Sequence, residues 1–171
     1  MGTDNEVVIK RTRLVRIVDA LCAMMLIVIT IGVVCSYGML PDRIPVHYNI
    51  NGVIDGYGNK AMIWLVLFFT WFPVVVLSVV EQFPRCWNTP FKLNDENRCR
   101  VLTLTWHLLS TTKFIIAGIF TYLTAMILLG RNLSVFFAPA FLTLMISNSL
   151  YWLVRMFLNR RTLLPRDGSQ D

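Results

Sequence analysis

Charged side chains are almost missing from four long stretches of this 171-residue sequence. The stretches are 17–40, 62–80, 101–129 and 133–153. Asp19, His107 and Lys113 are the only ionisable side chains in them apart from cysteine and tyrosine. Each stretch is about as long as the ~20 residues that a helix needs to cross the hydrocarbon core of a bilayer. This scarcity of charge excludes an ordinary soluble domain and predicts an all-α integral membrane protein with four transmembrane helices.

The sequence also has too few cysteines in one region for a disulfide framework. Cys22 and Cys35 fall in the first apolar stretch, whereas Cys86 and Cys99 lie between the second and the third. A zinc site built from Cys86, Cys99 and His107 would lack the tight C-x-x-C spacing of structural zinc sites. Small apolar filler is the preferred interpretation of the four thiols, and no metal or cofactor is expected.

Basic residues flank the apolar stretches and do not form a patch interleaved with aromatic residues, which argues against a nucleic-acid partner despite a net charge of +6. Twelve Lys and Arg residues fall on one side of the predicted membrane, and only Arg43, Lys60 and Arg131 fall on the other. The positive-inside rule then places both termini in the cytoplasm. The predicted order is a basic N-terminus (1–16), a two-span unit (17–80) with an outer loop (41–61), a cytoplasmic loop (81–100), a transmembrane hairpin (101–157) and a cytoplasmic tail (158–171).

The outer loop is rich in residues that shape the backbone. Residues 46–50 alternate between apolar and polar, and Asn51-Gly52 follows, the preferred pair for a type I′ turn. Pro41 and Pro45 stiffen the approach to this segment. The pattern predicts a small β-hairpin, with Pro41, Pro45 and Gly52 as its structural residues.

The simplest register of this hairpin places Tyr48 opposite Asp55. It would put His47 and Asn49 on the face opposite Asp55, unless a bulge shifts the strands. An isolated two-stranded hairpin is marginally stable, so its apolar side should lie on the outer mouth of the bundle. That side consists of Tyr48, Ile50 and Val53.

The loop carries the pattern P-x-x-I-P-x-H-Y-N-x-x-G-x-x-D-x-Y-x-x-K. The matching positions are Pro41, Ile44, Pro45, His47, Tyr48, Asn49, Gly52, Asp55, Tyr57 and Lys60. With the flanking spans, over about residues 19–80, it resembles the N-terminal membrane domain of SdpI-type immunity proteins. The resemblance implies a multi-pass protein of the bacterial plasma membrane that protects against a secreted peptide toxin and signals to a cytoplasmic regulator. This chain departs from the family in having fewer spans.

Two functions of different classes follow. The first is a non-enzymatic membrane protein that binds an extracellular peptide or another ligand at its outer face. Its candidate ligand-binding residues are His47, Tyr48, Asn49, Asp55 and Lys60. The alternative is a membrane-embedded enzyme or metal-binding protein, in which His47 and Asp55 act at the lipid–water boundary as base and orienting residue or as metal ligands. The loop has one histidine, no cysteine and no serine-based motif, so the binding protein is preferred.

A polar cluster is predicted inside the membrane, from Asp19, His107, Lys113 and Asn148. Lys113 is expected to be held by Asp19 or Asn148. An ionisable residue in a transmembrane helix is a functional candidate by default, but small and polar residues also hold membrane helices together. The sequence leaves both interpretations open.

Overall fold

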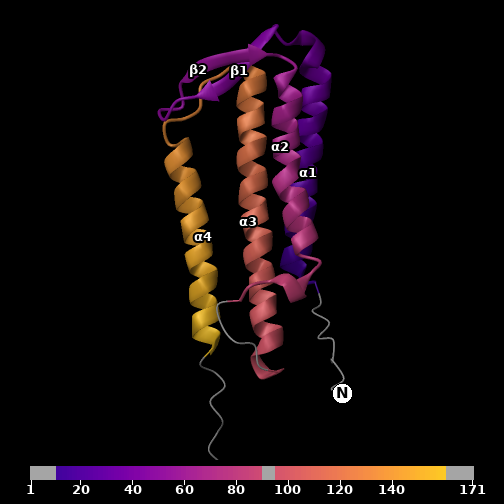
Figure 1. Cartoon of the computed structure of the whole chain (residues 1–171), viewed down its shortest axis with the longest axis vertical. Helices are drawn as coiled ribbons and strands as arrows, with labels where there is room; N and C mark the ends of the chain where they lie inside the picture. Colours follow the sequence, from indigo (N-terminus) through magenta and orange to yellow (C-terminus); the bar gives the residue numbers. More distant parts are fainter. Residues whose placement is uncertain (1–10, 90–94, 161–171) are drawn as a thin grey trace, which may run out of the picture.

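The computed structural model describes residues 11–89 and 95–160, which form four long helices with a β-hairpin at one end (Figure 1). The helices are α1 (Arg13–Ser36), α2 (Met62–Val80), α3 (Asp95–Leu129) and α4 (Phe137–Arg160). Between α1 and α2 lie the strands β1 (Arg43–Tyr48) and β2 (Ile54–Asn59), and the short 3-10 helices η1 (Tyr37–Met39) and η2 (Pro84–Cys86) follow α1 and α2. The predicted fold class is confirmed: the chain is mostly helical, with four helices that could span a membrane and a hairpin between the first two.

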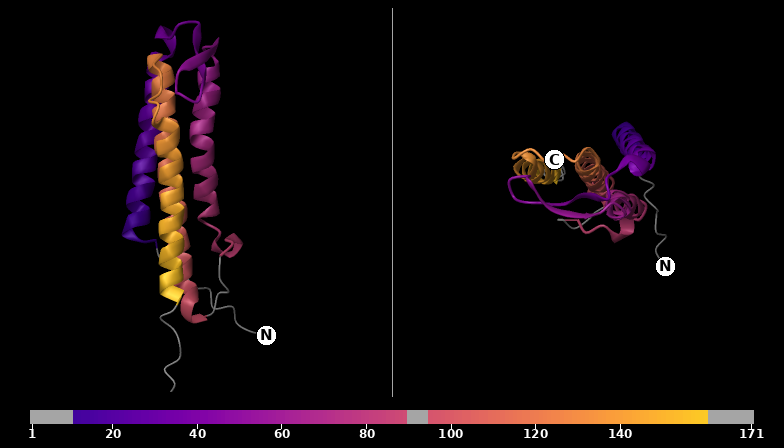
Figure 2. Two further views of the ribbon diagram at one scale, coloured as in Figure 1. Left: turned by 90° about the vertical axis from the view of Figure 1, so that its left-hand side faces the viewer. Right: turned by 90° about the horizontal axis from the view of Figure 1, so that it is seen from above.

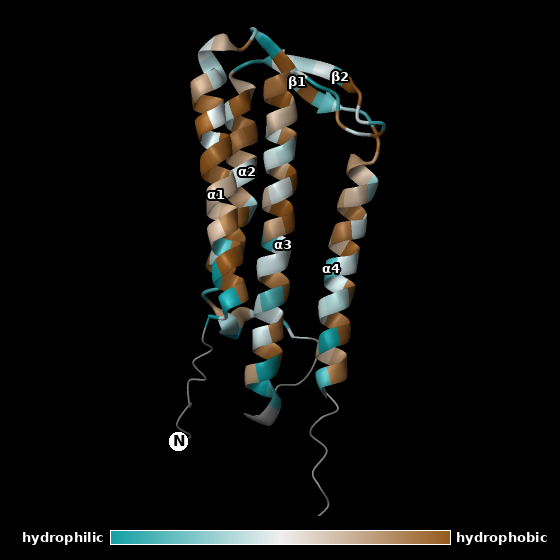
Figure 3. Ribbon diagram, turned by 180° about the vertical axis from the view of Figure 1, so that it is seen from behind, coloured by the Kyte–Doolittle hydropathy of each residue, from teal (hydrophilic) through white to brown (hydrophobic). Residues whose placement is uncertain are grey.

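The four helices expose many large apolar side chains. Figure 3, coloured by hydropathy, shows hydrophobic residues over much of their length. Each is long and apolar enough to cross a bilayer, and large exposed apolar surfaces are rare on soluble monomers. The chain therefore has the architecture of a multi-pass membrane protein. The start of α1 and the end of α4 lie at the end of the bundle away from the hairpin (Figure 1). Which end faces the cytoplasm stays a prediction, and residues 1–10 and 161–171 of the predicted termini lie outside the described residues.

Helix boundaries differ from the apolar stretches where a helix continues beyond the predicted membrane boundary. The second helix has the expected bounds, but α3 begins at Asp95, six residues before the predicted start at 101. Hydropathy marks where a helix meets the bilayer, whereas Glu96, Arg98 and Arg100 are good helix formers despite their polarity. The fourth helix begins at Phe137 instead of 133, because residues 132 and 133 contact the hairpin.

The third helix is the centre of the bundle, and it packs against each of the other three (Figure 2). Near the hairpin the core joins α1, α2, α3 and β1 through seven buried residues: Ile29, Val33, Leu40, Ile44, Ile63, Leu67 and Ile127. Farther from the hairpin, a second cluster joins α1, α2 and α3, and a third joins α3 to α4 through Leu104, Trp152 and Met156. The fourth helix buries least of its apolar window, so its attachment depends mainly on α3 and on the hairpin.

The pairing of the hairpin strands has two irregularities that the simplest register lacks. Val46 is the extra residue in β1, between the pairs Pro45–Tyr57 and His47–Gly56. Tyr48 pairs with Ile54 and His47 pairs with Gly56, so Asp55 is the extra residue in β2. The simplest register, in which Asp55 faces away from His47, is therefore wrong, and the bulged alternative is the one observed. A bulged residue is released from the strict alternation of the two faces, and here Asp55 turns to the same side as His47.

The turn is also different from the type I′ turn that Asn51-Gly52 predicted. A type I′ turn needs positive φ at both central residues. Among the described residues, only Gly52 and Gly130 have positive φ, at 77° and 61°. The Gly52 amide donates to the Asn49 carbonyl, and the Asn49 amide donates to the Val53 carbonyl, both over 2.9 Å. These bonds close a three-residue loop whose last residue is left-handed, a common hairpin form.

The tip of the hairpin is hydrogen-bonded to the connection between α3 and α4. The Leu133 amide donates to the Gly52 carbonyl over 2.8 Å, and the Ile54 amide donates to Asn132 Oδ1 over 2.9 Å. The Tyr48 hydroxyl donates to the Arg131 carbonyl over 3.3 Å. The hairpin thus joins the α1–α2 half of the chain to the α3–α4 half.

Candidate functional site

The bulge brings His47 and Asp55 together at the surface of the hairpin. His47 Nδ1 lies 2.5 Å from Asp55 Oδ1, and the two side chains are 70% and 42% exposed. Gly56 permits this arrangement, because a Cβ atom there would lie 2.9 Å from the Cβ of His47. With Nδ1 in contact with a carboxylate, Nε2 is the atom through which the imidazole can meet a second group. The pair is therefore oriented and accessible.

A depression of about 440 Å³ lies beside His47, between the hairpin loop and the start of α4. Its lining includes apolar and polar side chains, among them His47, Tyr48, Asn49, Ile50, Leu133, Ser134 and Phe137. Ile50 is 87% exposed at its margin. The depression thus combines an exposed apolar side chain with polar groups at its edge.

Two of the predicted ligand-binding residues build the hairpin. Asn49 Oδ1 accepts hydrogen bonds from the amides of Asn51 and Val53, each over 3.0 Å. Burial raises the pKa of Tyr48 to about 12, so its hydroxyl stays protonated and donates to Arg131 as described above. These side chains border the depression, and their hydrogen bonds fix its shape.

Lys60 lies at the opposite end of the hairpin from His47. Its Nζ is 3.2 Å from Asp42 Oδ1, and its amide donates to the Asp42 carbonyl. The structure therefore separates Lys60 from the His47–Asp55 pair. Of the predicted structural prolines, Pro41 precedes β1, whereas Pro45 lies inside β1, buried and opposite Tyr57. Proline is tolerated there because a two-stranded sheet has only edge strands.

The apolar anchor of the hairpin is not the one expected. Ile50 and Val53 are exposed, and only Tyr48 of the predicted apolar side packs against the core. The anchoring side chains are Leu40 and Ile44, which are buried against α1, α2 and α3. With the bulge and the three-residue loop, the hairpin tip lies beside the start of α4. Ile50 and Val53 therefore do not pack against the bundle as the simplest register predicted.

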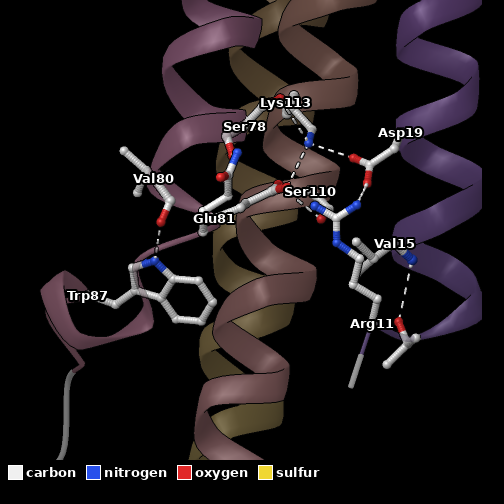
Figure 4. A network of polar contacts seen from close by, with 11 residues as sticks. Arg11, Val15, Asp19, Ser78, Val80, Glu81, Trp87, Ser110 and Lys113 are labelled. Atoms are coloured by element: carbon white, nitrogen blue, oxygen red, sulfur yellow. Dashed lines mark hydrogen bonds and ion pairs between the residues drawn. The ribbon is translucent and has the colours of Figure 1, made fainter. Parts of the chain in front are cut away.

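A second candidate site lies at the other end of the bundle, where Lys113 is 1% exposed (Figure 4). Its ammonium donates to Asp19 Oδ1 over 2.6 Å and to Glu81 Oε2 over 2.7 Å. Glu81 Oε1 accepts a bond from the Ser110 hydroxyl over 3.1 Å. Arg11 Nη1 lies 3.6 Å from Asp19 Oδ2. We call Arg11, Asp19, Glu81 and Lys113 the inner charge cluster; it joins α1, the end of α2, and α3.

The predicted polar cluster is therefore only half correct. Lys113 does meet Asp19, but Asn148 donates to Thr112, and His107 contacts the Thr12 hydroxyl over 2.8 Å. Successive residues of a helix point about 100° apart, so side chains at 107, 112 and 113 leave α3 in three directions. Glu81 is absent from the predicted cluster because it directly follows the uncharged stretch 62–80 and falls in the predicted loop 81–100.

No cysteine belongs to the inner charge cluster or lines the depression beside His47. Cys22 is buried and Cys35, Cys86 and Cys99 are exposed, all four as free thiols. Among residues 11–89 and 95–160, no three His, Cys, Asp or Glu side chains lie within reach of one metal ion. The Cys86, Cys99 and His107 combination is thus not assembled in the described part of the chain.

Comparison with known proteins gives one match. The family model described as Domain of unknown function (DUF1648) matches residues 24–71. The match takes in the hairpin and the adjoining halves of α1 and α2. It covers less than a third of the chain. No curated protein and no solved structure matches this chain.

Proposed function

We propose that this multi-pass membrane protein is non-enzymatic and binds a peptide at its outer face, in the depression between the hairpin tip and α4. The observation that carries the proposal is the exposed His47–Asp55 pair at the edge of that depression. The hairpin, Leu133 and Phe137 form a preorganised surface, and Ile50 offers an exposed apolar contact. A peptide with one apolar side chain and a nearby hydrogen-bonding group would complement both features.

The finer proposal concerns the source of that peptide. The resemblance to SdpI-type proteins favours a secreted peptide toxin, with the chain in a bacterial plasma membrane as an immunity protein. The matched domain of unknown function covers the hairpin, the segment that carries the resemblance. Signalling to a cytoplasmic regulator would use the other end of the bundle, and the hairpin supplies a link because its tip is bonded to the α3–α4 connection.

The proposal is tested by photo-crosslinking in intact cells that express the full chain and are exposed to medium from toxin-producing cells. A photoreactive phenylalanine analogue at Ile50 should give one adduct of discrete mass. The same analogue at Met39 is the matched control, because Met39 is 80% exposed in η1 and does not line the depression. Equal adducts at both positions would contradict a site in the depression.

His47→Ala should leave abundance and thermal stability unchanged, because the imidazole is mostly exposed, and should weaken the Ile50 adduct at least tenfold. Immunoblotting of membranes checks the abundance, and the adduct yield checks the binding.

A specific observation also favours the enzyme or metal-binding alternative: Asp55 orients the His47 imidazole, as a catalytic base or a metal ligand requires. Stoichiometric zinc in the purified protein that disappears in His47→Ala would therefore favour this alternative and contradict the peptide site.

A further inference from the structure

A cleft of about 470 Å³ runs between α1 and α2 in the half of the bundle away from the hairpin. Its volume is in the ~300–1,000 Å³ range of small-molecule sites. Its walls are apolar, with Ala23, Leu26 and Ile27 from α1 and Trp71, Val74 and Val75 from α2. One end contains the inner charge cluster. The cleft therefore has the polarity of an amphiphile, apolar along its length and charged at one end.

The apolar end of the cleft is closed by a bond between the two helices. Trp71 Nε1 donates to the Thr30 hydroxyl over 3.0 Å. From Trp71 to Gln82 at the charged end, α2 and its C-terminal cap rise by about 16 Å at ~1.5 Å per residue. Half of a bilayer core is ~15 Å. The cleft thus has the length of one leaflet. With α2 crossing the hydrocarbon core, its charged end would lie at the level where lipid headgroups begin.

At the charged end, Arg11 and Asp19 can each make further hydrogen bonds. Lys113 and Glu81 are fully buried and bonded to each other and to neighbours. Arg11 and Asp19 are 51% and 27% exposed, and the 3.6 Å between them is too long for a hydrogen bond. Arg11 is held nearby by the Trp106 ring, 5.9 Å from its guanidinium carbon. The mouth of the cleft therefore presents a guanidinium and a carboxylate oxygen side by side (Figure 4).

We propose that the cleft binds a phosphatidylethanolamine-type lipid, with one acyl chain between α1 and α2, its phosphate at Arg11 and its ammonium at Asp19. A planar guanidinium suits a phosphate, and a primary ammonium donates hydrogen bonds to a carboxylate. The trimethylammonium of phosphatidylcholine has no N–H to donate, and phosphatidylglycerol has no cation for Asp19. The charge pair thus selects a headgroup that carries both a phosphate and a cation with N–H groups to donate. This site is at the opposite end from the proposed peptide site and does not depend on it.

Native mass spectrometry of the detergent-purified full chain tests the proposal. With each lipid added in turn at equal concentration, the chain should retain one phosphatidylethanolamine and at least tenfold less phosphatidylcholine or phosphatidylglycerol. Ala23→Phe should abolish retention by filling the cleft. Met24→Phe is the matched control, since Met24 is the next residue on α1, is exposed and does not line the cleft.

Val75→Trp fills the cleft from the α2 wall and should repeat the result of Ala23→Phe, with the thermal midpoint of each variant confirming that it is folded. Arg11→Gln should reduce retention of phosphatidylethanolamine at least tenfold. Equal retention by Ala23→Phe, Val75→Trp and Met24→Phe would overturn the site. Equal retention of the three lipids by the wild type would overturn the assigned headgroup.

Discussion

Lys113→Met is expected to lose about 3–5 kcal/mol of stability, the usual cost of breaking a buried ion pair by removing one partner. The methionine would leave Glu81, which is 1% exposed, with a buried carboxylate and only the Ser110 hydroxyl to bind it. Asp19 would lose its closest partner and keep only Arg11 at 3.6 Å. The expected signs are low accumulation in membranes and a lower midpoint of unfolding in mixed detergent micelles.

Two further variants separate the cost of an unpaired buried charge from the cost of lost side-chain packing. Adding Glu81→Gln to Lys113→Met should restore a large part of the stability, because the uncompensated charge is then removed. Lys60→Met is the matched control: its partner Asp42 is 95% exposed, and exposed pairs contribute only ~0–1 kcal/mol. A Lys113→Met protein as stable as the wild type would contradict the description of the inner charge cluster as an ion-paired connection between helices.

Gly52→Ala is expected to detach the hairpin tip from the α3–α4 connection. Gly52 has a φ of 77°, and a Cβ atom there would lie 2.7 Å from the Leu133 carbonyl oxygen. The left-handed conformation alone costs an L-residue about 1–2 kcal/mol, and the clash with backbone adds to it. Hydrogen exchange by mass spectrometry should show faster exchange in peptides that contain the amides of Ile54 and Leu133.

Gly38→Ala is the control for this variant. Gly38 also lies near the hairpin end of the bundle, but its φ is not positive and a Cβ atom there would meet nothing within 4 Å. Its exchange pattern should match that of the wild type. If Gly52→Ala exchanged no faster than Gly38→Ala, the hairpin tip would not be bonded to the α3–α4 connection in solution.

The helices could be predicted from the sequence because one property decides them. Stretches of about 20 apolar residues have to be helical in a bilayer, where every backbone polar group needs an internal partner. The bounds of α2 follow directly from this rule. The early start of α3 does not, because a helix that extends into water is stabilised by local propensity and packing.

The hairpin could be predicted, but not its register. The turn residues and the alternating pattern are local signals, but they do not set the length of the loop. Here Asn49 pairs with Val53 across three residues, and the ladder is irregular at Val46 and Asp55. The meeting of His47 with Asp55 follows from this register, which no local pattern indicates.

The inner charge cluster shows the same limit. The sequence pairs Lys113 with Asp19 because both are charged residues in apolar stretches at similar depth. Glu81 sits one residue beyond an apolar stretch, and nothing local indicates that it is buried. If the partly exposed Asp19 were the only partner, replacing Lys113 by an apolar residue of similar length would destabilise the protein little. The second partner, Glu81, is a fully buried carboxylate, and it makes the same replacement strongly destabilising.

The sidedness of the hairpin is the claim on which the proposed function depends, and thiol labelling in intact cells tests it directly. In a chain without its four native cysteines, Asn51→Cys would place one thiol at the exposed hairpin tip, and Asn88→Cys would place one in the exposed segment after η2. A membrane-impermeant maleimide should label the first in intact cells and the second only after the cells are lysed. Labelling of Asn88→Cys and protection of Asn51→Cys in intact cells would contradict an outward-facing hairpin and the peptide site built on it.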